Sequence, residues 1–185
     1  MGALPSFFMG WVRLRPFFDF WSIVMKKTSS SLAHGAMIAA LYAALSYLQN
    51  VIFPGSASQM IQFRVAESLN ALAFFTPAAI PGLSIGCAVF NLAFAAALPL
   101  DILIGTAATA LSAWAMWLLR RRPWLGLWMP AVFNGALVGW ELSFFMGGGF
   151  WLNCGCVALG EALVMLTLGN LLRLTLLKHR SRFSF

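Results

Sequence analysis

Long apolar segments alternate with short breaks along most of the chain after residue 24. The breaks carry residues that end helices, namely Pro54, Thr76, Pro99, Pro123 and Gly147. This alternation predicts six helices over about residues 33–48, 61–75, 81–98, 101–119, 125–146 and 150–177. Because a membrane span needs about 20 apolar residues, the pattern favours an all-α integral membrane protein built as one bundle of six helices.

The first 24 residues do not fit this pattern. They are rich in aromatic residues, but Arg13, Pro16 and Asp19 interrupt any span, and no clean apolar core with a cleavage site follows. Met25 precedes two lysines and a Ser/Thr run, which resembles a natural start. We therefore expect residues 1–24 to be an extension outside the core fold and residues 25–185 to form the membrane domain. An interfacial amphipathic segment is the alternative for residues 1–24.

Composition agrees with a lipid environment. The chain has 185 residues, of which 61% are hydrophobic and only 9% are charged, so a soluble domain could not hide its apolar surface. Three cysteines, Cys87, Cys154 and Cys156, lie in apolar surroundings. Their odd number and the absence of Cys-x-x-Cys spacing argue against a disulfide framework or a zinc site.

The net charge of +7 is concentrated in clusters between and beside the spans. These clusters are Lys26 with Lys27, Arg120 to Arg122, and the C-terminal group Arg173, Lys178, Arg180 and Arg182. With six spans all of them fall on one side, which the positive-inside rule makes cytoplasmic. We therefore expect both termini in the cytoplasm. A basic patch could instead bind nucleic acid, but beside apolar spans it more often fixes orientation.

Four acidic residues lie within or at the edge of the predicted spans. They are Glu67, Asp101, Glu141 and Glu161. A carboxylate in lipid is costly, so such residues usually face a bundle interior or a polar cavity. The predicted topology places the first three near the outer ends of their helices, and Glu161 about 16 Å along the last one.

Polar residues share helix faces with these acids. Asp101, Thr109 and Ser112 form one stripe, Asn134 lies seven residues before Glu141, and Asn153 lies eight before Glu161. This arrangement predicts an internal pocket in the outer half of the bundle. Its candidate residues are Gln62, Arg64, Glu67, Asn91, Asp101, Asn134, Glu141, Trp151, Asn153 and Glu161.

Several of these candidates have structural alternatives. Asn91 and Asn134 could hold helices together through hydrogen bonds. Arg64 and Glu67 have the spacing of an ion pair on one helix. The outer aromatic residues fit an interfacial belt, although Trp151 is the one we expect to stack on a ligand.

The first predicted span also has a flat face of small residues. Gly35, Ala39 and Ala43 form one column, and the next is Ala36, Ala40 and Ala44. Such a face suits close approach of another helix. Two glycine pairs with the same spacing, Gly82 with Gly86 and Gly135 with Gly139, are candidates for packing inside the bundle.

Three stretches carry a family resemblance over about residues 31–172. IQFRVAESLNALAFFTPAAIPGLSIGC, FNGALVGWELSFF and FWLNCGCVALGEALV resemble the QueT family, the substrate-binding S-components of energy-coupling factor (ECF) transporters. The resemblance implies the six-helix S-component fold in the plasma membrane and uptake of a queuosine precursor, a 7-deazaguanine base or a relative. It also implies a transmembrane coupling protein, EcfT, and two ATPases as partners. In S-components the small-residue face of the first helix contacts EcfT, which here maps onto Ala36, Ala40 and Ala44.

The chemistry of a guanine-like edge suits this set of residues. One carboxylate can accept its ring N–H and exocyclic amine together, and a second could hold a cationic substituent. We expect Glu141 and Glu161 to be the principal acceptors, with Asn153 and Trp151 nearby and Arg64 and Glu67 at the rim.

We expect neither enzymatic activity nor a cofactor or metal. The chain has no Gly-rich phosphate loop, so ATP hydrolysis is left to partner subunits, and His34 lies far from the carboxylates without a nucleophile or metal constellation. The alternatives are an S-component for another small heterocyclic vitamin, since one fold serves many ligands, an intramembrane enzyme, or an assembly protein.

Overall fold

Helices make up all the regular structure of the part that the computed structural model describes, residues 29–56, 61–93 and 100–179. Their bounds are α2 (Ser29–Ile52), η2 (Val65–Phe74), α3 (Ala79–Ala93), α4 (Asp101–Leu118), α5 (Pro123–Gly126), α6 (Met129–Phe145), α7 (Phe150–Val164), η3 (Met165–Gly169) and α8 (Asn170–Lys178). The last three join into one continuous helix with a π-helical turn, and α5 is a single turn. The described residues therefore agree with six helices, while the expected extension 1–24 lies outside them.

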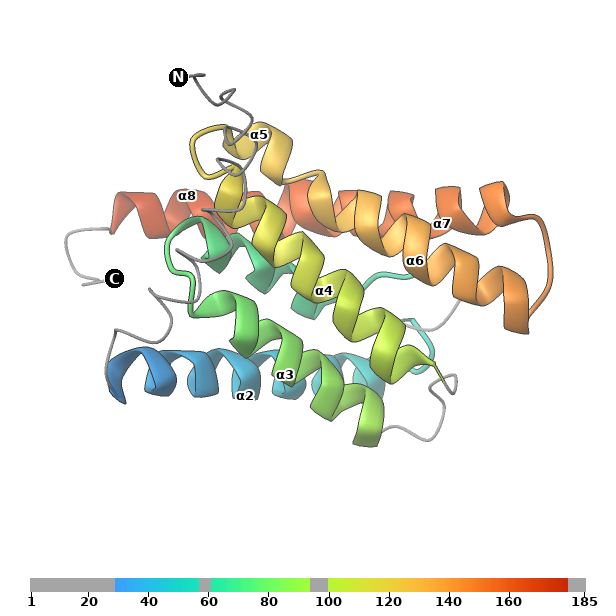
Figure 1. Ribbon diagram of the computed structural model, residues 1–185, viewed down its shortest axis with the longest axis horizontal. Helices are drawn as coiled ribbons and strands as arrows, with labels where there is room; N and C mark the ends of the chain where they lie inside the picture. Colours follow the sequence, from blue (N-terminus) through green and yellow to red (C-terminus); the bar gives the residue numbers. More distant parts are fainter. Residues whose placement is uncertain (1–28, 57–60, 94–99, 180–185) are drawn as a thin grey trace, which may run out of the picture.

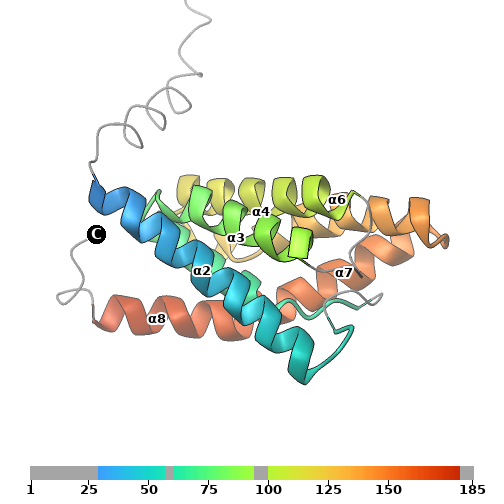
Figure 2. The ribbon, with the colours of Figure 1, turned by 90° about the horizontal axis from the view of Figure 1, so that it is seen from below.

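The long helices lie roughly along one axis; α2 and α3 run in the same direction, and from α3 onward the long helices alternate in direction. In Figure 1, α2 and α3 begin at the left end, where α4 and α8 finish, and α4 and α7 begin at the opposite end. Figure 2 shows α2 crossing below α3 and α4. The exposed residues Arg120 to Arg122, which follow α4, and Lys178, which ends α8, thus lie at the end where α2 begins. These described residues agree with the clustering that the charge pattern predicted, while Lys26, Lys27, Arg180 and Arg182 lie outside the described residues.

The second predicted span differs from the expectation. Residues 61–64 are not helical, and Val65–Phe74 forms a 3-10 helix whose buried residues include Glu67 and Asn70. At about 2.0 Å per residue it covers about 20 Å, too little for the roughly 30 Å hydrocarbon core. It contacts α2, α3, α4, α7 and α8. Because protein surrounds it, η2 is an interior element, and its polar groups find partners within the bundle.

Glycines allow the closest approaches between helices. A Cβ at Gly82 of α3 would lie 2.6 Å from the carbonyl oxygen of Gly35 on α2, and one at Gly86 would lie 2.7 Å from that of Ala39. Between α6 and α7, a Cβ at Gly139 would lie 2.7 Å from the Cα of Cys154. Both glycine pairs therefore pack helices inside the bundle, as their spacing indicated.

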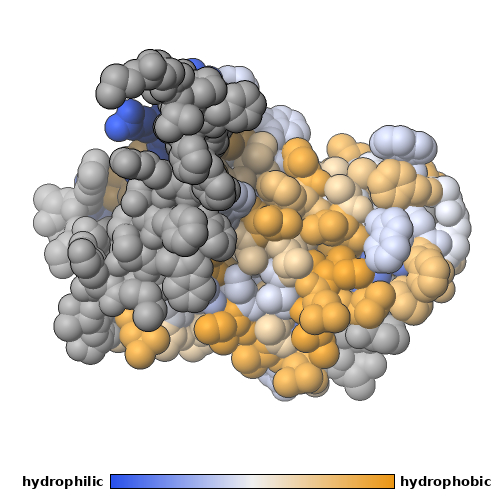
Figure 3. Space-filling model, viewed as in Figure 1, coloured by the Kyte–Doolittle hydropathy of each residue, from blue (hydrophilic) through white to orange (hydrophobic). Residues whose placement is uncertain are grey.

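The exterior is strongly apolar. Figure 3 shows one face on which apolar side chains form a broad area over the described helices. Large exposed residues occur on every long helix, among them Leu41, Leu92, Leu103, Trp140, Phe144 and Leu159. Among the described residues, 31–52 and 150–178 are long and apolar enough to cross a membrane, and shorter apolar helices cover 65–74, 79–93 and 102–118.

Candidate functional site

Glu67 is the centre of a closed hydrogen-bond network inside the bundle. Its carboxylate is fully buried and accepts hydrogen bonds from the Tyr42 hydroxyl at 2.5 Å, the Thr109 hydroxyl at 2.9 Å and the Asn70 amide. These three neutral donors come from α2, α4 and η2, so they tie three elements together. The sequence placed Glu67 at a pocket rim, whereas the structure places it in the interior with its acceptor capacity largely used.

Arg64, the residue immediately before the 3-10 helix, is also buried. Residues three apart eclipse one another in a 3-10 helix, which aligns Glu67 and Asn70. The Arg64 guanidinium points toward α3, with Nη2 3.7 Å from the Cys87 sulfur, and the Asn91 amide lies 3.6 Å from the same atom. A Cβ at Gly105 of α4 would lie 2.9 Å from the Asn91 Nδ2 and 3.9 Å from both terminal nitrogens of Arg64. Because glycine has no side chain, position 105 leaves room for the side chains of Asn91 and Arg64.

Glu161 of α7 differs sharply from Glu67. It is fully buried, and neither of its carboxylate oxygens has a hydrogen-bond partner in the described part of the chain. It lies close enough to Arg64 and Glu67 to interact electrostatically with both. An apolar environment makes an unsatisfied carboxylate costly, and such groups in native proteins call for an explanation.

Two further polar side chains lie at the level of Glu161. Ala108 of α4, Val138 of α6 and Val157 of α7 belong to one buried cluster. Ser112, Asn134 and Glu161 each lie one turn from a member of that cluster, and because the helices alternate in direction all three lie on the same side of it. We call these three residues the central polar layer. The Ser112 hydroxyl and both amide atoms of Asn134 are buried without a hydrogen-bond partner among the described residues.

The remaining predicted residues separate into two groups. Glu141 is fully buried but lies on the other side of the apolar cluster, toward the α6–α7 turn. The Asn153 amide donates to the Ser143 hydroxyl at 3.0 Å and to the Gly147 carbonyl at 3.1 Å, so it holds that turn. Trp151 is 83% exposed and its ring packs against Phe150, with centroids 5.0 Å apart, so the structure does not bring it to the central polar layer.

Two residues of the predicted set occupy connecting positions. Gln62 is buried, and its backbone crosses α7 at Gly160, where a Cβ would lie 2.0 Å from the Gln62 carbonyl oxygen. This crossing brings residues 61–64 next to Glu161. Asp101 is the first residue of α4, and its side chain lies outside the part that the structure describes.

Sequence reasoning did not single out Tyr42 or Asn70. Tyr42 stands among small and apolar residues of the first helix, and Asn70 in an apolar run. The one available indication for Asn70 was its spacing of three from Glu67, which identifies a neighbour only once the helix is known to be 3-10. Tyr42 carried no such indication.

The described helices have an apolar exterior and bury a polar layer between them. The chain matches the model of the QueT transporter family over residues 32–178. It therefore belongs to this family, whose members are ECF S-components. No curated protein and no solved structure matches the chain. Family membership and the apolar helices together indicate that the chain is a membrane transport protein rather than an enzyme.

Proposed function

We propose that the chain is the substrate-binding subunit of an ECF-type importer in the plasma membrane and that it binds a queuosine precursor in the central polar layer. The observation that carries this proposal is the Glu161 carboxylate, which is fully buried and has no hydrogen-bond donor in the described part of the chain. A ligand that brings donors to this depth would remove the cost of its burial.

A 7-deazaguanine edge matches the layer chemically. Its ring N–H and exocyclic amine lie side by side, and one carboxylate accepts both in a charge-assisted pair. Its carbonyl oxygen needs a donor, which the unsatisfied Asn134 amide or the Arg64 guanidinium can supply. In this proposal Glu141, one apolar layer nearer the α6–α7 turn, would receive a cationic substituent if the ligand carries one.

We expect the purified chain to bind 7-deazaguanine and queuine without nucleotide or metal, as measured by calorimetry. The matched control is 7-deazaadenine, which has the same bicycle but places a ring acceptor beside its amine. That ring acceptor would face the Glu161 carboxylate, which is itself an acceptor. We therefore expect 7-deazaadenine to bind with an affinity at least about 100-fold lower than that of 7-deazaguanine. Equal affinity for the two bases would contradict a carboxylate that reads the guanine edge.

We also propose that the chain crosses the membrane six times with both termini in the cytoplasm, and that residues 61–74, inside the bundle, make the second crossing. In the variant Arg121→Cys, the new thiol lies in the exposed turn after α4 and should react with an impermeant thiol reagent only from the cytoplasmic side. A cysteine at exposed Gly149 should react only from outside; Gly147 and Gly148 are less suitable because their φ angles of 78° and 87° favour glycine. The background carries Cys154→Ala and Cys156→Ala. Reaction of both positions from the same side would contradict this topology.

The partners in this proposal are EcfT and two ATPases, and α2 offers a face for EcfT. Ala36, Ala40 and Ala44 are exposed, whereas the neighbouring column packs on α3. We expect Ala40→Trp to abolish transport with the partner subunits, because the bulky ring prevents close helix approach. Ligand binding by the isolated chain should persist. Val132→Trp on α6, where Val132 is 53% exposed, is the matched control and should preserve both activities. Equal loss of binding and transport in Ala40→Trp would count against this face.

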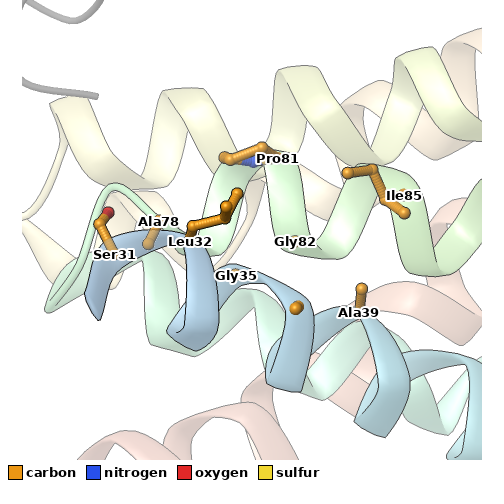
Figure 4. A pocket seen from close by; sticks show the side chains of 9 residues that line it. Ser31, Leu32, Gly35, Ala39, Ala78, Pro81, Gly82 and Ile85 are labelled. Atoms are coloured by element: carbon orange, nitrogen blue, oxygen red, sulfur yellow. The ribbon is translucent and has the colours of Figure 1, made fainter. Parts of the chain in front are cut away.

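A groove lies beside this face, between α2 and α3. It has a volume of about 390 Å³ and is lined mainly by small and apolar residues, including Leu32, Gly35, Pro81 and Ile85. Figure 4 shows these residues on the two facing helices, with Ala39 further along α2. The groove lies away from Glu161, so we assign it no part in recognition of the base.

A further inference from the structure

The non-helical residues 61–64 need an external support. Two backbone hydrogen bonds hold them, from the Phe63 N–H to the Ser56 carbonyl oxygen at 3.0 Å and from the Glu67 N–H to the Arg64 carbonyl oxygen at 2.9 Å. Their other buried backbone groups must find partners elsewhere. The segment nevertheless has to be placed accurately, because it carries Gln62 and Arg64 into the interior and leads directly to Glu67.

Gln49, near the end of α2, supplies that support. It is 8% exposed, and its amide nitrogen donates to the carbonyl oxygen of Phe63 and, at 2.9 Å, to the Ser56 hydroxyl. Its carbonyl oxygen accepts the backbone N–H of Val65 at 2.8 Å. One buried amide therefore bonds the backbone on both sides of Arg64, where the coil becomes the 3-10 helix.

The opposite side of the segment is fixed by α7. The Gln62 backbone lies so close to Gly160 that a Cβ at position 160 would be 2.0 Å from its carbonyl oxygen and 2.8 Å from its carbonyl carbon. Glu161 is the next residue of α7. The segment is thus held between a side chain of α2 and the bare backbone of α7, immediately beside the central polar layer.

We propose that Gln49 is a positioning residue for ligand binding, which holds residues 61–65 against α7 so that Arg64 and Glu161 keep their places around the base. Gln49 does not touch the ligand. The role in binding rests on the function proposed above, whereas the role in fixing the segment rests on the hydrogen bonds alone.

The test replaces Gln49 with methionine, which has a similar length but makes none of these hydrogen bonds. The matched control is Asn50→Leu, which removes the amide of the next, half-buried residue on the same helix end. Calorimetry with 7-deazaguanine gives the affinity, and hydrogen–deuterium exchange of the ligand-free protein gives the local protection of residues 61–65. A general loss of stability would raise exchange throughout the bundle, so exchange in α6 and α7 serves as the internal reference.

We expect Gln49→Met to weaken binding by about tenfold or more and to raise exchange in residues 61–65 but not in α6 or α7. Asn50→Leu should change neither quantity. Unchanged exchange in residues 61–65, or unchanged affinity, would overturn the proposal, as would the same effects in Asn50→Leu. If the wild-type chain failed to bind any 7-deazaguanine, the proposed function would fall, while the exchange data would still decide whether Gln49 fixes the segment.

Discussion

Replacing Glu161 with glutamine is expected to weaken binding of 7-deazaguanine by about 100-fold or more. Each charge-assisted hydrogen bond contributes about 1.5–3 kcal/mol, and the new amide would present a donor to a ligand donor. The fold should be retained, because glutamine is nearly isosteric and a neutral amide costs less to bury than a carboxylate without donors. Calorimetry measures the affinity, and thermal unfolding in detergent measures the stability.

Glu141→Gln is the informative comparison for this variant. Both glutamates are fully buried, but only Glu161 belongs to the central polar layer. We expect Glu141→Gln to weaken binding of 7-deazaguanine less than Glu161→Gln does, and to have its larger effect on a ligand with a cationic side arm. Wild-type affinity in both variants would refute the assignment of the site to these carboxylates.

Replacing Gly160 with alanine is expected to destabilise the folded protein by roughly 1–3 kcal/mol, the usual cost of overpacking. The new Cβ would lie 2.0 Å from the Gln62 carbonyl oxygen, so backbone rather than a flexible side chain would have to move. Affinity for the base should fall as well, because residues 61–64 would be pushed away from Glu161. Chemical unfolding in detergent and calorimetry measure the two effects.

Gly155→Ala on the same helix is the control for this prediction. A Cβ at position 155 would have no heavy atom within 4 Å. The substitution should therefore leave the stability unchanged or raise it slightly, because alanine has a higher helix propensity than glycine. If Gly160→Ala proved as stable and as competent for binding as Gly155→Ala, residues 61–64 would not be clamped against α7.

Local sequence patterns predicted the all-helical fold class and an arrangement of six helices, with which the described residues agree. Pro54, Pro99 and Pro123 separate apolar runs, and both the breaks and the runs are local properties that survive into the fold. The basic residues after α4 and the end of α8 lie at one end of the bundle, as the charge pattern required. The Gly82 and Gly139 contacts followed from spacing alone, because close helix packing needs small residues at one-turn intervals.

The conformation and position of the second helix could not be predicted from local sequence, because they depend on long-range contacts. Its sequence has the composition of a short span, and nothing local indicates that it begins at Val65, winds as a 3-10 helix and lies inside the bundle. Its position depends on the helices that surround it and on bonds such as that from Gln49, 16 residues away in sequence from Val65.

The same holds for the ranking of the acidic residues. Glu67 and Glu161 are both carboxylates in apolar segments, and the sequence separated them only by their expected depth, with Glu67 at a rim and Glu161 further inside. Glu67 is satisfied by Tyr42 and Thr109, 25 and 42 residues away in sequence, whereas Glu161 finds no hydrogen-bond donor among the described residues. The sequence thus identifies the carboxylates whose burial is costly. The helices packed around each one decide which carboxylate has hydrogen-bond donors and which has none among the described residues, because hydrogen bonds require donors at contact distance.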